Sequence, residues 1–166
     1  MVSRRLFIAG LAALPWTISA VAAEAGAPQT FLAEVYKRIA QTKKRKVNDF
    51  WQAPEGRPSA FTAEVVALWA KAEKKADGEI GPVDFDLFTN SQDAGPTAPT
   101  LATVDDDGAT AHVRATLKAP KPGKEASADD VLVFTLKRDA TGWRIDDIHG
   151  SVSGDSWNLR GLLSMP

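Results

Sequence analysis

The spacing of apolar residues changes once along this chain, and this change limits the kind of fold that the chain can form. Over 28–46 and 60–76, apolar residues recur every three or four positions, which is the pattern of a helix with one buried face. Over 109–118 they alternate with polar residues, which is the pattern of a strand. Helices followed by strands predict the α+β class, with two to three N-terminal helices covering one face of a curved antiparallel sheet to form a cone.

Local signals mark the ends of the two predicted helices. Pro28 suits the first turn of the first helix, because its missing N–H is no loss there. Ser59 is the candidate N-cap of the second helix, and Asp77-Gly78 follows that helix as a stop. The loop 47–58 joins the two helices, and we expect Trp51 to anchor it to the core.

Turn and loop signals separate the strands that alternation predicts. The run Asp105–Gly108 predicts a hairpin between the strands 100–104 and 109–118. The stretch 119–130 is predicted to be an exposed loop and 151–155 a linker. Further strands are expected at 83–87, 131–138 and 143–148, with a short closing helix or arm after the linker.

The segment 1–23 has the parts of a signal peptide. Arg4 and Arg5 precede an uncharged apolar run that ends in small residues, and cleavage before Glu24 or before Gly26 satisfies the small-residue rule. The run Ser3-Arg4-Arg5-Leu6-Phe7-Ile8 matches the twin-arginine export pattern except at Ile8, so the sequence predicts export to the periplasm. A general secretory leader and an uncleaved anchor are the alternatives. If the leader is cleaved, we expect the chain to contact the membrane only through the leader and only before cleavage.

Composition excludes several kinds of site. The chain has no cysteine, which excludes disulfides, thiolate nucleophiles and cysteine-ligated metals. The formal net charge is −1, and loss of the leader's arginines makes it more negative, so nucleic acid is not an expected partner. His112 and His149 lack the spacing of a metal site, and no phosphate-binding glycine loop occurs. We therefore expect no metal and no cofactor.

A short stretch before the first long strand is rich in polar side chains. We predict that these residues form a polar rim around the mouth of the cone and bind a cation or a cationic group; they are Asp84, Asp86, Gln92 and Asp93. The alternative is that they cap turns by accepting hydrogen bonds from the backbone. The spacing of the acids does not match a calcium-binding loop.

Asp146 and Asp147 are neighbours on the last predicted strand, so their side chains should point to opposite faces of the sheet. Simple alternation places Asp147 on the same face as Trp143 and Ile145. A carboxylate beside those rings needs a partner, and Arg160 from the closing segment is the candidate. Two interpretations follow: an ion pair that holds the C-terminal arm, or a carboxylate that contacts a ligand.

Three blocks of sequence form a recognisable pattern. They are Phe31-x-x-x-Val35-Tyr36, the run Asp84 to Asp93, and the ending Gly142 to Ile148 followed by Asn158-Leu159-Arg160-x-Leu162-Leu163. Together they resemble a family of small exported bacterial domains of unknown function, similar in fold to nuclear transport factor 2 and ketosteroid isomerase. The resemblance covers 28–163.

This resemblance implies a single nuclear-transport-factor-2-like domain over 28–166, location in the cell envelope, and no established activity. It also implies that a homodimer can form through the open face of the sheet. Isomerases of this fold use a carboxylate base and a tyrosine–aspartate pair in an apolar cone. Asp147 and Tyr36 could serve here, but no motif of that branch matches, so no catalytic residue is assigned.

The sequence leads to three hypotheses for function. The first is a non-catalytic exported domain that binds a small molecule or an envelope protein, with the candidate residues Asp84, Asp86, Gln92, Asp93, Trp143, Asp147, Tyr36 and Arg160. The second is an enzyme of the isomerase or dehydratase type that uses Asp147 and Tyr36. The third is an inhibitor or immunity-type protein, which would show an exposed apolar patch around Trp51 or Trp157.

Overall fold

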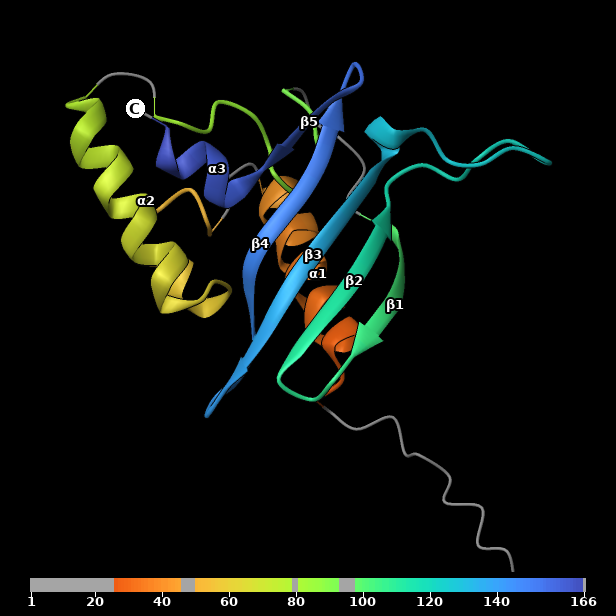
Figure 1. The fold of residues 1–166 in the computed structure, drawn as a ribbon, viewed down its shortest axis with the longest axis horizontal. Helices are drawn as coiled ribbons and strands as arrows, with labels where there is room; N and C mark the ends of the chain where they lie inside the picture. Colours follow the sequence, from red (N-terminus) through yellow and green to blue (C-terminus); the bar gives the residue numbers. More distant parts are fainter. Residues whose placement is uncertain (1–25, 46–49, 79–80, 93–97, 166) are drawn as a thin grey trace, which may run out of the picture.

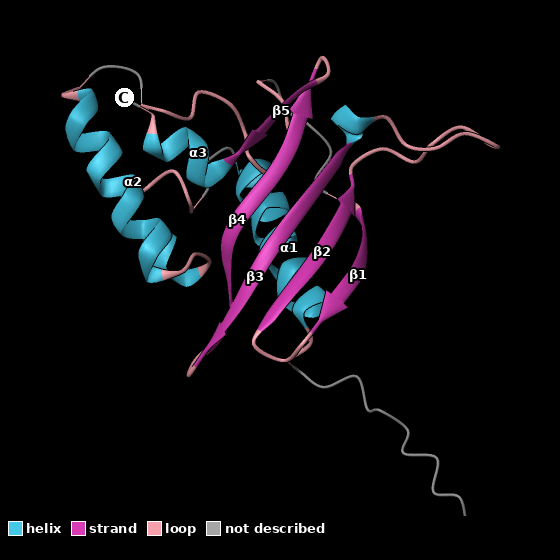
Figure 2. Ribbon diagram, viewed as in Figure 1, coloured by secondary structure: helices cyan, strands magenta, loops and turns pink. Residues whose placement is uncertain are grey.

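The computed structural model describes residues 26–45, 50–78, 81–92 and 98–165. This part of the chain is an α+β domain with a curved antiparallel sheet, as predicted (Figures 1 and 2). Its elements are α1 (Pro28–Arg45), the 3-10 turn η1 (Arg57–Ser59), α2 (Ala63–Ala76), β1 (Thr100–Asp106), β2 (Thr110–Thr116), the 3-10 turn η2 (Ala128–Asp130), β3 (Val131–Asp139), β4 (Gly142–Val152), β5 (Asp155–Asn158) and α3 (Leu159–Ser164).

The five strands form one meander in the order β1-β2-β3-β4-β5, with each strand antiparallel to its neighbours. The helix α1 crosses behind the sheet in Figure 1 and contacts β1 and β2. The helix α2 lies beyond β4, where it contacts α3. Thus α1 covers one face of the sheet, and α2 and α3 close one edge.

The core lies between α1 and the inner face of the sheet. In β2, Ala111, Val113 and Ala115 are buried while His112 and Arg114 point to the outer face, so the predicted alternation is confirmed. The facing residues of β3 and α1 are also fully or almost fully buried, and include Leu132, Phe134, Leu136, Leu32, Val35 and Ile39. Each large side chain buried in this way contributes roughly 1.5–3 kcal/mol to folding.

The strand predicted over 83–87 is wrong. Residues 87–90 form a turn instead, and only an isolated bridge joins Asp86 to Ser91. The Asp86 carboxylate accepts a hydrogen bond from the Phe88 backbone N–H at 2.9 Å, which bends the chain locally and competes with a strand. The turn places Phe88 in the core, where its ring stacks on Phe134 at 5.8 Å.

The start of α2 also differs from the prediction. The N-cap is Thr62, not Ser59, and its hydroxyl accepts the Val65 N–H. Ser59 instead ends the turn η1 and donates to the Gly56 carbonyl at 2.6 Å. The helix ends at the predicted stop, where Asp77 adopts a left-handed conformation with φ 48°.

The predicted linker over 151–155 is wrong as well. The strand β4 continues to Val152, and β5 pairs back on it from Asp155 to Asn158. Ser153 and Gly154 make the turn with φ values of 54° and 92°, a conformation that costs glycine little. The closing helix predicted after this segment is present as α3.

A bulge in β4 decides where the two adjacent aspartates point. Thr135 of β3 pairs with Asp147 and the next residue, Leu136, pairs with Ile145, so Asp146 is an extra residue. An extra residue shifts the alternation of side chains by one position. Asp147 therefore lies on the outer face of the sheet, and the prediction that it shares a face with Trp143 and Ile145 is wrong.

In the described part of the chain, no helix is long and apolar enough to cross a membrane. The predicted leader, with Arg4 and Arg5, lies outside the described residues, as does Asp93.

Candidate functional site

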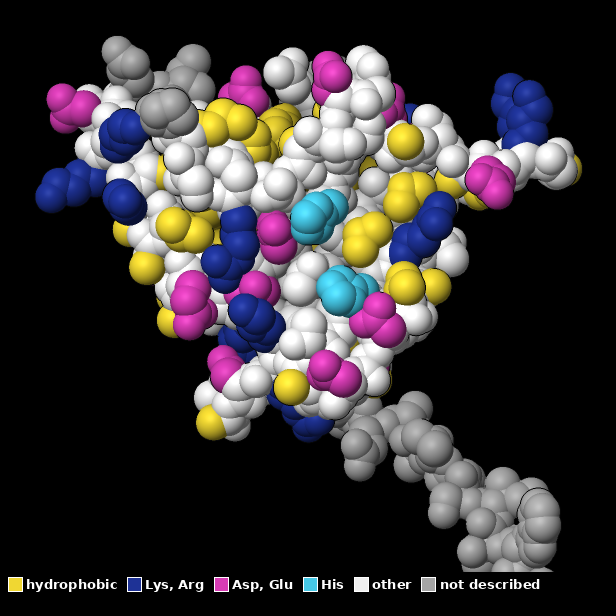
Figure 3. Space-filling view, in the orientation of Figure 1, with side chains coloured by type: hydrophobic (Ala, Val, Ile, Leu, Met, Phe, Trp, Pro, Cys, Tyr) yellow, Lys and Arg dark blue, Asp and Glu magenta, His cyan; other side chains and the backbone are white. Residues whose placement is uncertain are grey.

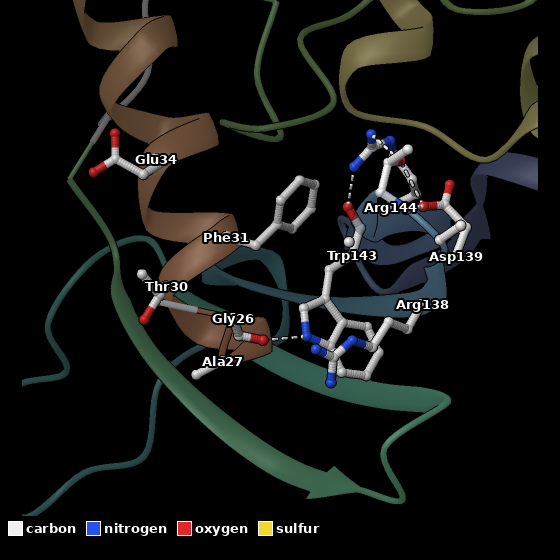
Figure 4. A pocket seen from close by; sticks show the side chains of 12 residues that line it. Gly26, Ala27, Thr30, Phe31, Glu34, Arg138, Asp139, Trp143 and Arg144 are labelled. Carbon is white, nitrogen blue, oxygen red and sulfur yellow. Dashed lines mark hydrogen bonds between the residues drawn. The ribbon is translucent and has the colours of Figure 1, made fainter. Parts of the chain in front are cut away.

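Trp143 lines a cleft between the start of α1 and the turn that joins β3 to β4 (Figure 4). The cleft has a volume of about 620 Å³. Its walls come from two parts of the chain: Gly26, Ala27, Thr30, Phe31 and Glu34 on one side, and residues 138–144 on the other. Of the residues that the sequence singled out as candidate ligand contacts, only Trp143 lines this cleft.

Backbone pairing and one hydrogen bond fix the position of the Trp143 ring. Arg138 and Trp143 are direct partners across β3 and β4. The indole N–H of Trp143 donates to the Gly26 carbonyl at 2.6 Å, which ties the start of the domain to the sheet. The Arg138 guanidinium lies over the Trp143 ring, 5.8 Å from its centroid.

Two arginines and two acids line the cleft, and none of the four forms an ion pair with another. Among the described residues Arg138 forms no ion pair, and Arg144 donates only to the Trp143 carbonyl and the Thr141 hydroxyl. On the acidic side, Glu34 is paired with Lys37 at 3.2 Å and points away from the indole in Figure 4.

Asp139, the other acid of this cleft, is engaged within its own turn. The Thr141 hydroxyl and backbone N–H both donate to the Asp139 carboxylate, and these bonds lower the pKa of that carboxyl below its ordinary value. One carboxylate oxygen therefore serves the turn. The cleft thus presents two guanidinium groups with spare donors beside the half-buried Phe31 ring, while the Trp143 indole is almost fully buried.

Tyr36 lies farther along α1 than the cleft residues, in the aromatic core. Its hydroxyl donates to the Phe88 carbonyl at 2.9 Å, and its ring packs edge-on against Phe88 and Phe134. Burial, and secondly the Asp86 carboxylate, raise the pKa of Tyr36 well above its ordinary value. A smaller hollow of about 310 Å³ runs between this residue and Leu101 of β1.

The structure does not bring Tyr36 and Asp147 together. Tyr36 contacts the inner face of β3 through Phe134, whereas Asp147 pairs with Thr135, the next residue, which points to the outer face. The enzyme hypothesis required both side chains in one dry pocket. That arrangement does not occur.

The predicted ion pair between Asp147 and Arg160 is wrong. Because of the bulge in β4, Arg160 pairs with Asp146 instead. The Arg160 guanidinium donates to the Asp146 carboxylate at 2.5 Å and to the Asp146 carbonyl at 2.9 Å. Asp147 instead accepts the backbone N–H groups of Ile148 and Arg160. Its second oxygen lies 3.3 Å from the ring nitrogen of His149.

Three side chains contact the Asp146 carboxylate. Besides Arg160, it contacts Lys137 of β3 at 3.0 Å and the Thr62 hydroxyl at 3.0 Å. Burial alone would raise the pKa of Asp146, but the hydrogen bonds from Arg160, Lys137 and Thr62 together lower it. The side chain is only 8% exposed, so this carboxylate joins α2, α3 and the sheet and is not available to a ligand.

The predicted polar rim stays a prediction, because Asp93 lies outside the described residues. Asp84 and Gln92 are exposed, while Asp86 caps its own turn. The acids of the hairpin after β1 behave in the same way. For example, the Asp107 carboxylate accepts the N–H groups of Ala109 and Thr110.

Figure 3 looks onto the outer face of the sheet, where both histidines are visible with an acid beside each. The Nδ1 atom of His112 lies 2.7 Å from a carboxylate oxygen of Asp105, and the Nε2 atom of His149 lies next to the Asp147 carboxylate. Within the described ranges, no group of three or more acidic or histidine side chains is placed to hold a metal ion.

Neither Trp51 nor Trp157 is exposed in the way that the apolar patch expected of an interaction protein requires. Trp51 is only 5% exposed and packs on Trp69. Trp157 is half-buried, packs edge-on against Phe85, and donates its indole N–H to Asn90.

Sequence reasoning missed Arg138 and Arg144, although a signal was available. Both flank the short turn that joins β3 to β4, and this tight hairpin places Arg138 opposite Trp143. A register drawn from that turn would have brought the two arginines and the indole to one end of the sheet.

Comparison of the chain with known protein families, with characterised proteins and with solved structures finds no match.

Proposed function

We propose that this protein is an exported, non-catalytic binding domain whose ligand enters the Trp143 cleft. The ligand class that fits is a small molecule with an anionic group next to a flat apolar part. The observation that carries this proposal is the Arg138 guanidinium, which lies 5.8 Å over the Trp143 ring and forms no ion pair with a described residue.

A guanidinium in this position offers paired N–H donors to a carboxylate or phosphate, and the half-buried Phe31 ring on the facing wall of the cleft offers an apolar surface. Arg144 adds further donors on the same side of the cleft. The volume of about 620 Å³ lies within the usual range for small-molecule sites.

The finer architecture that we propose is the nuclear-transport-factor-2-like cone. A curved antiparallel sheet with α1 across one face and further helices at one edge supports it. Domains of that fold carry many functions, so the ligand class is argued from the cleft and not from the fold. Gel filtration of the mature chain tests the homodimer that the resemblance implies.

The binding proposal is tested with three probes of graded chemistry. Phenyl phosphate carries both features, inorganic phosphate only the charge, and phenol only the ring. Binding is measured by calorimetry, with the change in total tryptophan fluorescence as a second signal. We expect phenyl phosphate to bind more tightly than either fragment.

The variant Arg138→Ala should weaken phenyl phosphate binding by about 10- to 100-fold. This loss of affinity corresponds to the free energy of one hydrogen bond to a charged group. The matched control is Arg114→Ala, which removes an exposed arginine from the outer face of β2. Equal affinity in the two variants, or failure of all three probes to saturate, would refute a ligand site at this cleft.

Export is tested separately with the full chain in a bacterial host. The Arg4-Arg5 pair supports the twin-arginine route, so changing both residues to lysine should keep the protein in the cytoplasm. A general secretory leader would tolerate the two lysines. Cell fractionation and immunoblotting report the outcome, and a wild-type chain that stays in the cytoplasm contradicts export.

A further inference from the structure

The strand β1 lies at one edge of the sheet and pairs with β2 alone among the described strands (Figure 1). Six of its seven residues are exposed, and Leu101 is half-buried. An edge strand directs every second backbone N–H and C=O away from its neighbour, and these groups can pair with another extended chain. The free edge of β1 is therefore a candidate interaction surface.

Only one end of β1 carries features that hinder the addition of a further strand. From Thr100 to Thr103 the strand pairs with β2 in unbroken register, and its side chains are uncharged. The register then shifts at the extra residue Val104, and three aspartates follow at 105–107. Bulges and charges are the usual protection of an exposed edge. This protection leaves the first four residues of β1 open to pairing.

A hollow of about 310 Å³ lies beside this open part, between α1 and β1. Leu101 borders the hollow from the strand, and the exposed Ala33 and half-buried Ala40 border it from α1. Leu101 pairs with the buried Ala115 of β2, so its side chain lies on the inner face of the sheet. An added strand would direct every second side chain to the same face, into the space that the two small alanines leave.

The aspartates at 105–107 determine which charge the added chain should carry at that end. His112 is the only basic side chain of the described residues that contacts one of them, and its Nδ1 atom lies 2.7 Å from an Asp105 carboxylate oxygen. Opposite charges on neighbouring strands attract each other, and like charges repel. A basic residue next to these acids is therefore favoured, and an acidic one is disfavoured.

We infer that the open edge from Thr100 to Thr103 binds an extended segment of another protein, which adds to the sheet as a further strand. The segment carries small or β-branched apolar residues toward α1 and a basic residue at the end next to the aspartates. Backbone hydrogen bonds supply the affinity, and the hollow and the acids supply the specificity. This hollow and the Trp143 cleft share no lining residue, so the inference does not rest on the ligand proposed for that cleft.

The test uses the purified chain and two labelled probe peptides, with fluorescence anisotropy as the readout. One peptide has four alternating valine and threonine residues followed by two arginines, and the other has the reverse order, because a strand can add in either direction. We expect one of them to saturate with a Kd below about 1 mM. Replacing its two arginines by glutamates should weaken binding at least about tenfold.

Methylation of the peptide backbone distinguishes strand addition from a loose contact. Only alternate N–H groups of an added strand face its neighbour, so methylating one alternate set should abolish binding. Methylating the other set should leave most of the affinity. Hydrogen exchange of the backbone amides of Thr100 to Thr103, followed by nuclear magnetic resonance, should slow at alternate residues when the peptide binds.

The variant Ala33→Trp places a large ring in the hollow and should weaken peptide binding at least about tenfold, because the added side chains lose their space. Its matched control is Ala70→Trp, which makes the same change at an exposed alanine of α2 and should leave the affinity unchanged. Circular dichroism and thermal unfolding establish that both variants are folded.

Three results would overturn the inference: neither peptide saturates, the two methylated peptides bind equally well, or the variants at Ala33 and Ala70 have the same affinity. Gel filtration tests a different occupant of the edge. A dimer that excludes the peptides and is lost in Ala33→Trp would show that a second copy of the chain pairs with β1, which also overturns the inference. The phenyl phosphate experiment on Arg138 is independent of each of these results.

Discussion

Asp146 and Arg138 lie on adjoining strands and carry opposite charges, yet the fold uses them in opposite ways. Asp146 is buried and satisfied by Arg160, Lys137 and Thr62, which come from three different elements. Arg138 is exposed beside Trp143 and has no ionic partner among the described residues.

This contrast separates a structural charge from an available one. Removing a buried charge with several partners leaves those partners unsatisfied, so its cost appears in stability. Removing an exposed charge without a partner costs little stability, and its effect should appear only when a ligand is present. The following predictions test that division, beginning with the largest effect.

The largest loss of stability is expected for Asp146→Ala. Three donors would lose their acceptor at the junction of α2, α3 and the sheet. Because Lys137 and Arg160 remain partly exposed, we expect a loss of about 2–3 kcal/mol in the free energy of unfolding, measured by urea denaturation. The control Asp105→Ala removes an exposed acid and should change stability by less than about 0.5 kcal/mol. A comparable loss in both variants would show that Asp146 has no special role.

A smaller loss is expected for Thr62→Ala. The Thr62 hydroxyl caps α2 and also donates to Asp146, so its removal should cost about 1 kcal/mol. Ser59→Ala is the matched control, because Ser59 was the cap predicted from sequence and lies outside α2. Urea denaturation of both variants decides between them, and a larger effect at Ser59 would contradict the observed cap.

Acidification should reproduce part of the Asp146 effect. The folded-state pKa of Asp146 is lowered, so its contribution is complete above the ordinary aspartate pKa of about 3.9 and is lost as pH falls toward the folded-state value. The protonated carboxyl keeps its oxygen atoms, so we expect a smaller loss than in Asp146→Ala. Asp107 and Asp139 shift in the same direction, and a comparison with Asp146→Asn subtracts their contribution. Identical profiles from pH 2 to 6 for the two proteins would contradict the prediction.

The smallest change in stability is expected for Arg138→Ala. The unfolding free energy should stay within about 0.5 kcal/mol of the wild-type value, because no ion pair is lost. Thermal and urea unfolding measure this directly, without a ligand. A loss close to that of Asp146→Ala would mean that Arg138 also supports the fold, and the contrast between the two charges would disappear.

The candidate site was only partly predictable from sequence. Trp143, a candidate ligand contact from the sequence, lines the cleft without the other candidates, and the two arginines around it escape prediction because their meeting depends on the register of β3 and β4. Asp147 and Arg160 were paired on simple alternation. Because β4 contains one extra residue, Arg160 pairs with Asp146 instead. The alternation of apolar and polar residues does not predict where a bulge occurs.

The 83–87 stretch shows the same limit for the fold. Val83, Phe85 and Leu87 alternate as a strand would, but a strand needs a neighbour to pair with, and the Asp86 side chain bends the chain at Phe88 instead. The opposite holds for the predicted linker over 151–155. Strand β4 continues to Val152, so β5 has a neighbour to pair with, and the two strands form a hairpin.

The sequence by itself determined the class of fold, the order of helices before strands, and the alternating burial along β2, because periodic burial is written into the order of apolar and polar side chains. Only the tertiary structure decided which aspartate is buried, which residue caps α2, and that Gly26 is held by Trp143. These outcomes depend on contacts between residues far apart in the chain, and neither spacing nor composition records them.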